Sequence, residues 1–240
     1  MVLLTSQRRR KIKEYTLKLK ILEFLKWVAI DIYRAFKYGR KFGEYGLTLY
    51  CGKQGAGKTI GMVEYLERMR VKYPKAIIIT NFYYRYQTKP MSSWRDLLDV
   101  RNGEDGVIFA IDEIHLEYNS NDWKDFPENL LSEISQQRKQ KIKIIASSQV
   151  FTRVVKQLRE QAFDVVEART LAGRWTFQRC FDTEDYLAVV DNPEKKIKLH
   201  RKWRRNFIMT DKLRELYDSY KKVEAMRSKE YIPRSERGNV

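Results

Sequence analysis

The stretch "LTLYCGKQGAGKTIGMVEYL", Leu47 to Leu66, constrains the fold of this chain more than any other part of it. The apolar run Leu47–Cys51 precedes glycines and predicts a strand, and the spacing of apolar residues over Thr59–Val71 predicts a helix. Between them, Gly52 to Thr59 spell the full G-x-x-x-x-G-K-[ST] pattern of a phosphate-binding loop. A strand, such a loop and a helix in this order predict an α/β nucleotide-binding domain.

Each residue type of this loop suits the binding of a nucleoside triphosphate. Glycines let the backbone N–H groups approach the phosphates, and the positive end of the following helix faces the same charge. We expect Lys58 to reach the β- and γ-phosphates and the Thr59 hydroxyl to bind Mg²⁺. The predicted ligands are therefore a nucleoside triphosphate and Mg²⁺, and the predicted binding residues are Gly52, Lys53, Gln54, Gly55, Ala56, Gly57, Lys58, Thr59 and Ile60.

A pair of acids indicates hydrolysis as well as binding. The run "VIFAIDE" is a buried strand that ends in Asp112 and Glu113, and ligands of open α/β sheets bind at the carboxyl ends of strands. We expect Asp112 to hold the Mg²⁺ shell and Glu113 to orient or deprotonate the attacking water. The pair favours an ATPase over a protein that only binds nucleotide.

Further catalytic candidates lie around the strand "KIKIIASSQ". Gln149, at its tip, is expected to contact the γ-phosphate or the attacking water if this strand lies beside the Asp112 strand, with Ser148 as second choice. Arg138 precedes the strand and is a candidate to reach the nucleotide of a neighbouring subunit. Arg153 and Arg159 compete with it for that role.

Strand and helix signals alternate along the middle of the chain. Further strands are predicted at Lys75–Phe82, Gly106–Glu113 and Lys141–Gln149, and a helix at Glu128–Gln140. Ala162–Thr170 and Arg174–Asp182 predict a hairpin, and the segment from Asp211 to Met226 a polar helix. The predicted fold class is a P-loop NTPase, three layers α/β/α around a mostly parallel sheet.

Positive charge gathers at both ends of the chain. The net charge is +17, yet residues 1–41 hold 12 basic and 3 acidic residues, and residues 195–240 hold 15 and 6. We therefore expect a basic N-terminal arm (1–41), an ATPase domain (42–194) and a basic C-terminal extension (195–240). Such arms favour a polyanion as partner. In the extension, Trp203 and Phe207 lie among basic residues, a pattern that suits sequence-independent DNA binding.

The N-terminal arm contains an apolar stretch, Ile21–Phe36, that is interrupted by charges and too polar to span a membrane. It predicts an amphipathic helix that packs on the core, a partner, a membrane surface or a capsid portal. No secretory signal is evident, and the two cysteines, Cys51 and Cys180, show no metal-ligand spacing. The expected location is the cytoplasm, including the periphery of a membrane or a virion vertex.

The motifs "GKQGAGKT", "AIDEIH", "SQQRKQKIKIIASSQ" and "LREQAFDVVEAR" together resemble the zonula-occludens-toxin-like ATPase domain, a branch of the FtsK/HerA class of ATPases. The resemblance covers about Leu47 to Arg169, and Lys58, Thr59, Asp112, Glu113, Arg138 and Gln149 match its motifs. It implies ATP as the nucleotide, because nothing in the loop reads the base, and a ring, usually a hexamer, with the nucleotide between subunits and DNA through the centre. The membrane span that filamentous-phage relatives carry after this domain has no counterpart here.

Three functions remain open on the sequence. The first is a motor that translocates or packages viral or mobile-element DNA. The second is a membrane-associated assembly or export ATPase of phages. The third is a small-molecule or nucleotide kinase, whose loops share the spelling of Gly52 to Thr59, but the Asp112–Glu113 pair and the basic arms disfavour it.

Overall fold

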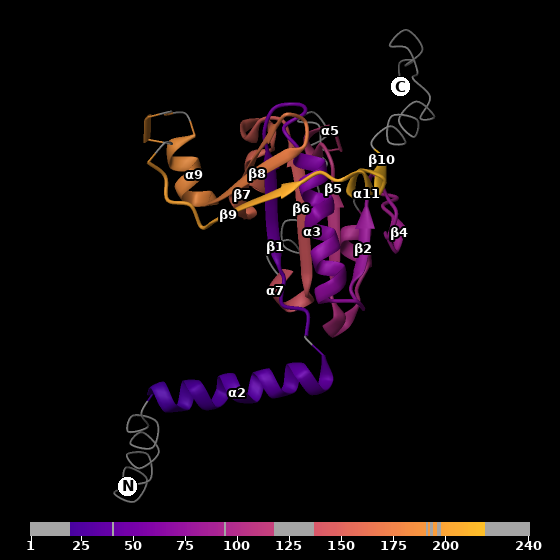
Figure 1. The fold of residues 1–240 in the computed structure, drawn as a ribbon, viewed down its shortest axis with the longest axis vertical. Coiled ribbons are helices and arrows are strands. Elements are labelled where there is room, and N and C mark those ends of the chain that lie inside the picture. Colours follow the sequence, from indigo (N-terminus) through magenta and orange to yellow (C-terminus); the bar gives the residue numbers. More distant parts are fainter. Residues whose placement is uncertain are drawn as a thin grey trace, which may run out of the picture. The chain divides into compact units, whose positions relative to one another are not determined.

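The computed structural model describes residues 20–39, 41–93, 95–117, 137–190, 192, 194–195 and 198–218 (Figure 1). The chain divides into two units, residues 1–41 and residues 42–240, and each is described by itself. The second unit carries the sheet and the phosphate-binding loop.

An eight-stranded sheet forms the centre of this unit, in the order β4-β2-β5-β6-β1-β7-β8-β9. In this order each strand from β4 as far as β7 is parallel to the one before it. The last two strands, β8 and β9, each run antiparallel to the strand before them. The predicted, mostly parallel sheet is thus confirmed, with strands at Gly46–Cys51 (β1), Ile77–Thr80 (β2), Lys89–Pro90 (β4), Val107–Ile111 (β5), Ile142–Ser148 (β6), Ala162–Leu171 (β7), Trp175–Asp182 (β8) and Trp203–Ile208 (β9).

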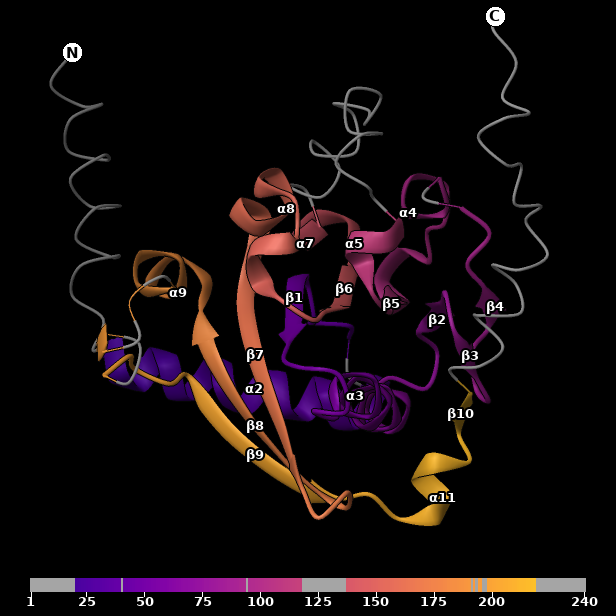
Figure 2. The ribbon, with the colours of Figure 1, turned by 90° about the horizontal axis from the view of Figure 1, so that it is seen from above.

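Helices cover both faces of the sheet, as Figure 2 shows. One face carries α3 (Lys58–Lys72), which confirms the helix predicted after the loop. The helices α5, α7 and α8 lie on the other face. The smaller helical elements are α4 (Asp96–Asp99), α5 (Ile114–Glu117), α7 (Gln137–Gln140), α8 (Lys156–Gln161), α9 (Thr183–Val189) and the 3-10 turns η1 (Gly103–Asp105) and η3 (Phe151–Arg153). Most of the helix predicted at Glu128–Gln140 lies outside the described residues.

Two apolar clusters fill the spaces between these layers. Successive residues of β5 point to opposite faces, so that Ile108 packs in the cluster under α3 and Phe109 in the cluster on the other face. All five residues of β5 are buried, as expected for a parallel strand covered on both sides. Cys51 and Cys180 are buried thiols, and burial, with Asp164 nearby, raises the pKa of the Cys180 thiol to about 12.

The C-terminal segment corrects one prediction. Helix α11 (Asp211–Arg214) ends after four residues instead of continuing, and β10 (Tyr217–Asp218) then pairs antiparallel with β3 (Tyr83–Tyr84). The Arg85 amide donates to the Leu216 carbonyl at 2.8 Å, and Leu216 and Tyr217 pack against the cluster under α3. This tertiary pairing overrides the helix propensity of the segment. The rest of the predicted helix, from 219 on, lies outside the described residues.

The first unit contains one described helix, α2 (Lys20–Tyr38), at the position of the predicted amphipathic stretch. At helical spacing, Ile21, Leu25, Val28, Ile32 and Phe36 share one face. Among the described residues, no helix combines the length and the apolar character needed to cross a bilayer.

Candidate nucleotide site

The phosphate-binding loop joins the end of β1 to the start of α3. Gly57, the last residue before α3, has a φ of 89°, and a Cβ at this position would lie 2.5 Å from the hydroxyl oxygen of Thr170 on β7. Both the backbone conformation and the available space therefore require glycine. The Thr170 hydroxyl also donates to the Ala56 carbonyl at 3.0 Å, which fixes the loop to β7.

Lys58 is the first residue of α3, and its side chain is only 6% exposed. Its Nζ donates to the Lys53 carbonyl at 3.3 Å and lies 3.9 Å from Oε1 of Glu113. The ammonium group therefore lies between the loop and the acidic pair. The positive end of the 15-residue helix α3 adds to this favourable potential for phosphate.

Thr59 and Asp112 meet beside this lysine, although 53 residues separate them in sequence. The Thr59 hydroxyl donates to Oδ1 of Asp112 at 3.1 Å, and the Ser147 hydroxyl donates to the same oxygen. Hydroxyl and carboxylate oxygens are the ligands that Mg²⁺ prefers, often together with phosphate oxygens. No group of three His, Cys, Asp or Glu that could hold a metal occurs within the described part of the chain. The adjacent oxygens of Thr59 and Asp112 fit a Mg²⁺ ion that a bound nucleotide would share.

Glu113 follows Asp112 in an unusual conformation. Its φ is 51°, in the left-handed region that costs a non-glycine residue about 1 kcal/mol. The Glu113 amide donates to Oγ of Ser147 at 2.9 Å, which holds the residue in place. The Glu113 side chain is 21% exposed, and its Oε2, which is buried, lies 3.3 Å from Nδ1 of His115. Glu113 therefore places a carboxylate close to Lys58 at the carboxyl edge of the sheet.

Asn81 supports the acidic pair and was not predicted from the sequence. It follows β2, the neighbour of β5 in the sheet. The Asp112 amide donates to Oδ1 of Asn81 at 2.7 Å, and Nδ2 of Asn81 donates to the Asp112 carbonyl at 3.1 Å. The polar end of the run "IIITN" was the available signal, but the pairing of β2 with β5 is not visible in sequence.

The strand β6 lies between β1 and β5, as the prediction for Gln149 required. Gln149 follows the strand and borders one cavity together with the start of the loop. Ser147, which the sequence did not single out, joins the Asp112 network because its hydroxyl donates to Oδ1 of Asp112 and accepts from the Glu113 amide. The Ser148 hydroxyl donates to the Val150 carbonyl at 2.9 Å and lies 3.3 Å from Nδ1 of His115. A contact of Gln149 with the γ-phosphate stays a prediction.

Arg138 lies at the amino ends of the parallel strands, whereas the loop lies at their carboxyl ends. Its guanidinium is 5.6 Å from the ring centre of Tyr45, which precedes β1. The seven residues of β6 separate it from the carboxyl edge, a distance of about 20 Å at about 3.3 Å per residue. Arg138 cannot serve the nucleotide site of its own chain, and its action on a neighbouring subunit stays a prediction.

The two competing arginines lie in the segment between β6 and β7. Arg153, in the turn after β6, is exposed. Arg159, on α8, is half-buried with its guanidinium 5.6 Å from the ring centre of Phe151. Arg153 is therefore the more accessible of the two to a neighbouring chain.

The sheet order, the loop and the acidic pair at the carboxyl edge define the α/β fold of P-loop NTPases. Comparison with solved structures agrees. The N-terminal domain of zonular occludens toxin from Neisseria meningitidis is similar over 73% of this chain and 100% of that domain, with a TM-score of 0.50 and 15% identity. At this identity the likeness concerns the fold alone, and at that level it confirms the resemblance seen in the sequence.

Two other solved structures are similar with lower scores. The genome packaging NTPase B204 from Sulfolobus turreted icosahedral virus 2, in complex with ATP-gammaS, gives a TM-score of 0.41 and 12% identity over 58% of this chain and 93% of that chain. The ATPases 2 and 3 of EccC from Thermomonospora curvata give a TM-score of 0.40 and 12% identity, over 58% of this chain and 35% of that chain. No protein-family model and no curated protein matches the sequence.

Proposed function

We propose that this protein is a Mg²⁺-dependent ATPase that uses ATP hydrolysis to translocate or package viral or mobile-element DNA. The main support for ATPase activity is that Lys58, Thr59, Asp112 and Glu113 lie together at the carboxyl edge of the sheet. Thr59 is 3.1 Å from Asp112, and Lys58 is 3.9 Å from Glu113.

Each of these residues has a distinct part in the proposed reaction. The loop and Lys58 bind the phosphates and stabilise the charge on the transferred group. Thr59 and Asp112 hold Mg²⁺, which neutralises the phosphate oxygens when it is bound. Glu113 accepts the proton of the attacking water, and its amide bond to Ser147 sets where the carboxylate lies.

DNA as the cargo is supported by the distribution of charge. A near-neutral ATPase domain flanked by basic arms suits a partner with a regular array of phosphates. As in the implied family, we propose a ring of identical subunits, in which an arginine such as Arg138 or Arg153 completes the site of a neighbour.

The test is ATP hydrolysis by the full chain with and without long double-stranded DNA, beside Glu113→Gln. We expect DNA to stimulate turnover, and the variant to lose turnover while fluorescent ATP analogues still bind. Glutamine keeps the size and a hydrogen-bonding oxygen but cannot take the proton, so a loss of about 10²-fold or more is expected. An active Glu113→Gln protein would remove the proposed base.

A second function is a membrane-associated assembly or export ATPase, which the apolar face of α2 and its basic surroundings favour. Sedimentation with liposomes that contain an anionic phospholipid separates the two functions. The full chain should bind and the chain without residues 1–41 should not. Turnover that rises with liposomes but ignores DNA would establish this alternative.

A further inference from the structure

The antiparallel strands β7, β8 and β9 carry a row of cationic and aromatic side chains on one face. In the register of these strands, Arg179 of β8 is opposite Arg204 of β9, and Phe177 is opposite both Arg169 of β7 and Asn206 of β9. Trp175 follows on the same face, because alternate residues of a strand share a face. We call Arg169, Trp175, Phe177, Arg179 and Arg204 the arginine face.

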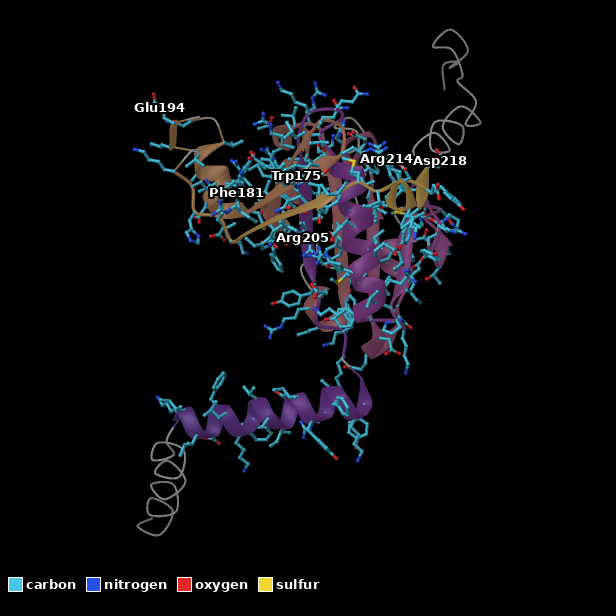
Figure 3. The ribbon with its side chains drawn as sticks, viewed as in Figure 1. Trp175, Phe181, Glu194, Arg205, Arg214 and Asp218 are labelled. Carbon is cyan, nitrogen blue, oxygen red and sulfur yellow. The ribbon has the colours of Figure 1, made fainter. Side chains whose placement is uncertain are left out.

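The opposite face of the same strands is covered by α3. Arg205, one residue after Arg204, donates through Nε to Oε1 of Glu64 on α3 at 3.0 Å, and a Cβ at Gly61 of α3 would meet Gln178. Figure 3 labels Trp175 and Arg205 on this part of the sheet. Arg204 and Arg205 therefore point to different faces, and the arginine face is the one that α3 leaves open.

The three arginines of this face are exposed and have no hydrogen bond or ion pair among the described residues. Arg179 and Arg204 are direct cross-strand neighbours, an arrangement in which like charges destabilise a sheet. The carboxylate in their row, Glu167, accepts a hydrogen bond from the Tyr186 hydroxyl at 2.8 Å. Burial and the nearby Glu167 raise the pKa of Tyr186, which therefore keeps its proton and its bond to Glu167. A bound anion would relieve the repulsion between the arginines.

Two aromatic rings lie beside these charges. The ring centres of Trp175 and Phe177 are 4.8 Å apart with an interplanar angle of 36°. Trp175 is 43% exposed, and its Nε1 donates to Oδ1 of Asn206 at 3.2 Å. An exposed ring that is held in one orientation offers a surface on which a base can stack.

A cavity extends from this face to the start of the phosphate-binding loop. It measures 1530 Å³ and is bordered by the start of the phosphate-binding loop, by Phe177, Arg179 and Arg204, and by Tyr186 of α9. Its volume exceeds the range of about 300–1,000 Å³ that small-molecule sites occupy. The space therefore suits an extended ligand better than a single nucleotide.

We propose that the arginine face binds a single strand of nucleic acid, with phosphates on Arg169, Arg179 and Arg204 and bases stacked on Trp175 and Phe177. Unpaired bases are needed for such stacking, so a single strand fits and a duplex does not. Because the same cavity reaches the loop, strand binding can respond to the bound nucleotide. The inference refines the proposed DNA motor, yet strand binding and ATP turnover are measured separately and can fail separately.

The test is fluorescence anisotropy of the full chain with a labelled single-stranded oligonucleotide of about 20 nucleotides, longer than the about 4–16 that one such module covers, and with the duplex of the same length. The first variant is Arg179→Gln/Arg204→Gln. Its control is Lys75→Gln/Lys212→Gln, which removes the same charge from exposed positions elsewhere. The second variant is Trp175→Ala. Its control is Trp203→Ala, because Trp203 is opposite Cys180 and thus lies on the face toward α3.

We expect the arginine variant to lose single-strand affinity and to lower the slope of log K against log salt by about 1.4, at about 0.7 per phosphate contact. Trp175→Ala should weaken binding about 5- to 150-fold, from about 1–3 kcal/mol per stacked base. Both controls should bind as the parent chain does. Arg179→Lys/Arg204→Lys, which keeps the charge, should retain most of the salt slope.

Three results would overturn the proposal. Equal losses of single-strand affinity in Arg179→Gln/Arg204→Gln and in Lys75→Gln/Lys212→Gln would mean that only net charge matters. A loss with Trp203→Ala but not with Trp175→Ala would move stacking to the other face. If Arg179→Gln/Arg204→Gln raised the KM for ATP and left strand binding unchanged, the arginine face would be part of the nucleoside site. ATP turnover in the absence of DNA tests the proposed ATPase alone. If there were no such turnover, the proposed function would be refuted, while the strand-binding proposal would still be decided by the anisotropy measurement.

Discussion

The sharpest test of the nucleotide site is Asn81, because it holds the backbone of Asp112 through two hydrogen bonds. Asn81→Ala removes two hydrogen bonds, of 2.7 Å to the Asp112 amide and 3.1 Å to its carbonyl. At about 0.5–1.5 kcal/mol for each bond, the free energy of unfolding should fall by about 2 kcal/mol. At about 2–4 °C per kcal/mol for a domain of this size, Tm should fall by about 4–8 °C. Turnover should fall about 10²-fold, the usual effect of a small misplacement of catalytic groups.

A matched control is available at the other end of β5. Nδ2 of Asn102 donates to the carbonyls of Lys75 and Gly106 at 2.9 and 3.0 Å, far from the loop. Asn102→Ala should therefore lower Tm by a similar amount and leave turnover intact below the transition. Urea unfolding and steady-state ATP hydrolysis are measured for both variants. If Asn81→Ala kept the turnover of Asn102→Ala, Asn81 would be only structural and its positioning role refuted.

Three further predictions concern the loop and the sheet edge. Lys58→Ala should abolish binding of a fluorescent ATP analogue while the fold persists by circular dichroism, because it removes a buried ammonium that lies against the loop, 3.3 Å from the Lys53 carbonyl, and would bind the phosphates. Thr170→Val removes the hydrogen bond to Ala56 and should cost about 1 kcal/mol in thermal unfolding, with weaker ATP binding. Burial opposes ionisation of Asp96, but Lys89 and two backbone amides outweigh it and hold the pKa of Asp96 below its usual value. That stabilisation is present above about pH 4 and is lost as pH falls through the lowered pKa, so Asp96→Asn should destabilise at pH 7 and converge with the parent chain in acid.

The parallel sheet and the loop were predictable because their signals are local. Glycine spacing, β-branched runs and the strand–loop–helix order depend on neighbouring residues only. The roles of Asn81 and Ser147 were not, since both arise from which strand lies beside β5. Strand order is set by the packing of the whole sheet, and a polar residue at the tip of a strand has no meaning until its neighbour is known. The same reason explains β10, where pairing with β3 decided against a helix.

The basic C-terminal extension shows why charge counting alone cannot locate a binding surface. Lys202, Arg204 and Arg205 contribute equally to the net charge, yet they differ in what they can bind. Lys202 forms an ion pair of 2.7 Å with Asp164, and Arg205 one of 2.9 Å with Glu64. Because β9 alternates its side chains between two faces, only Arg204 is directed to the open face without a carboxylate partner in the described structure. A phosphate can bind Arg204 without displacing a carboxylate, whereas at Lys202 or Arg205 it would first have to replace one. The cations that determine affinity for DNA should therefore be the three arginines of the arginine face rather than the most basic stretch of the sequence.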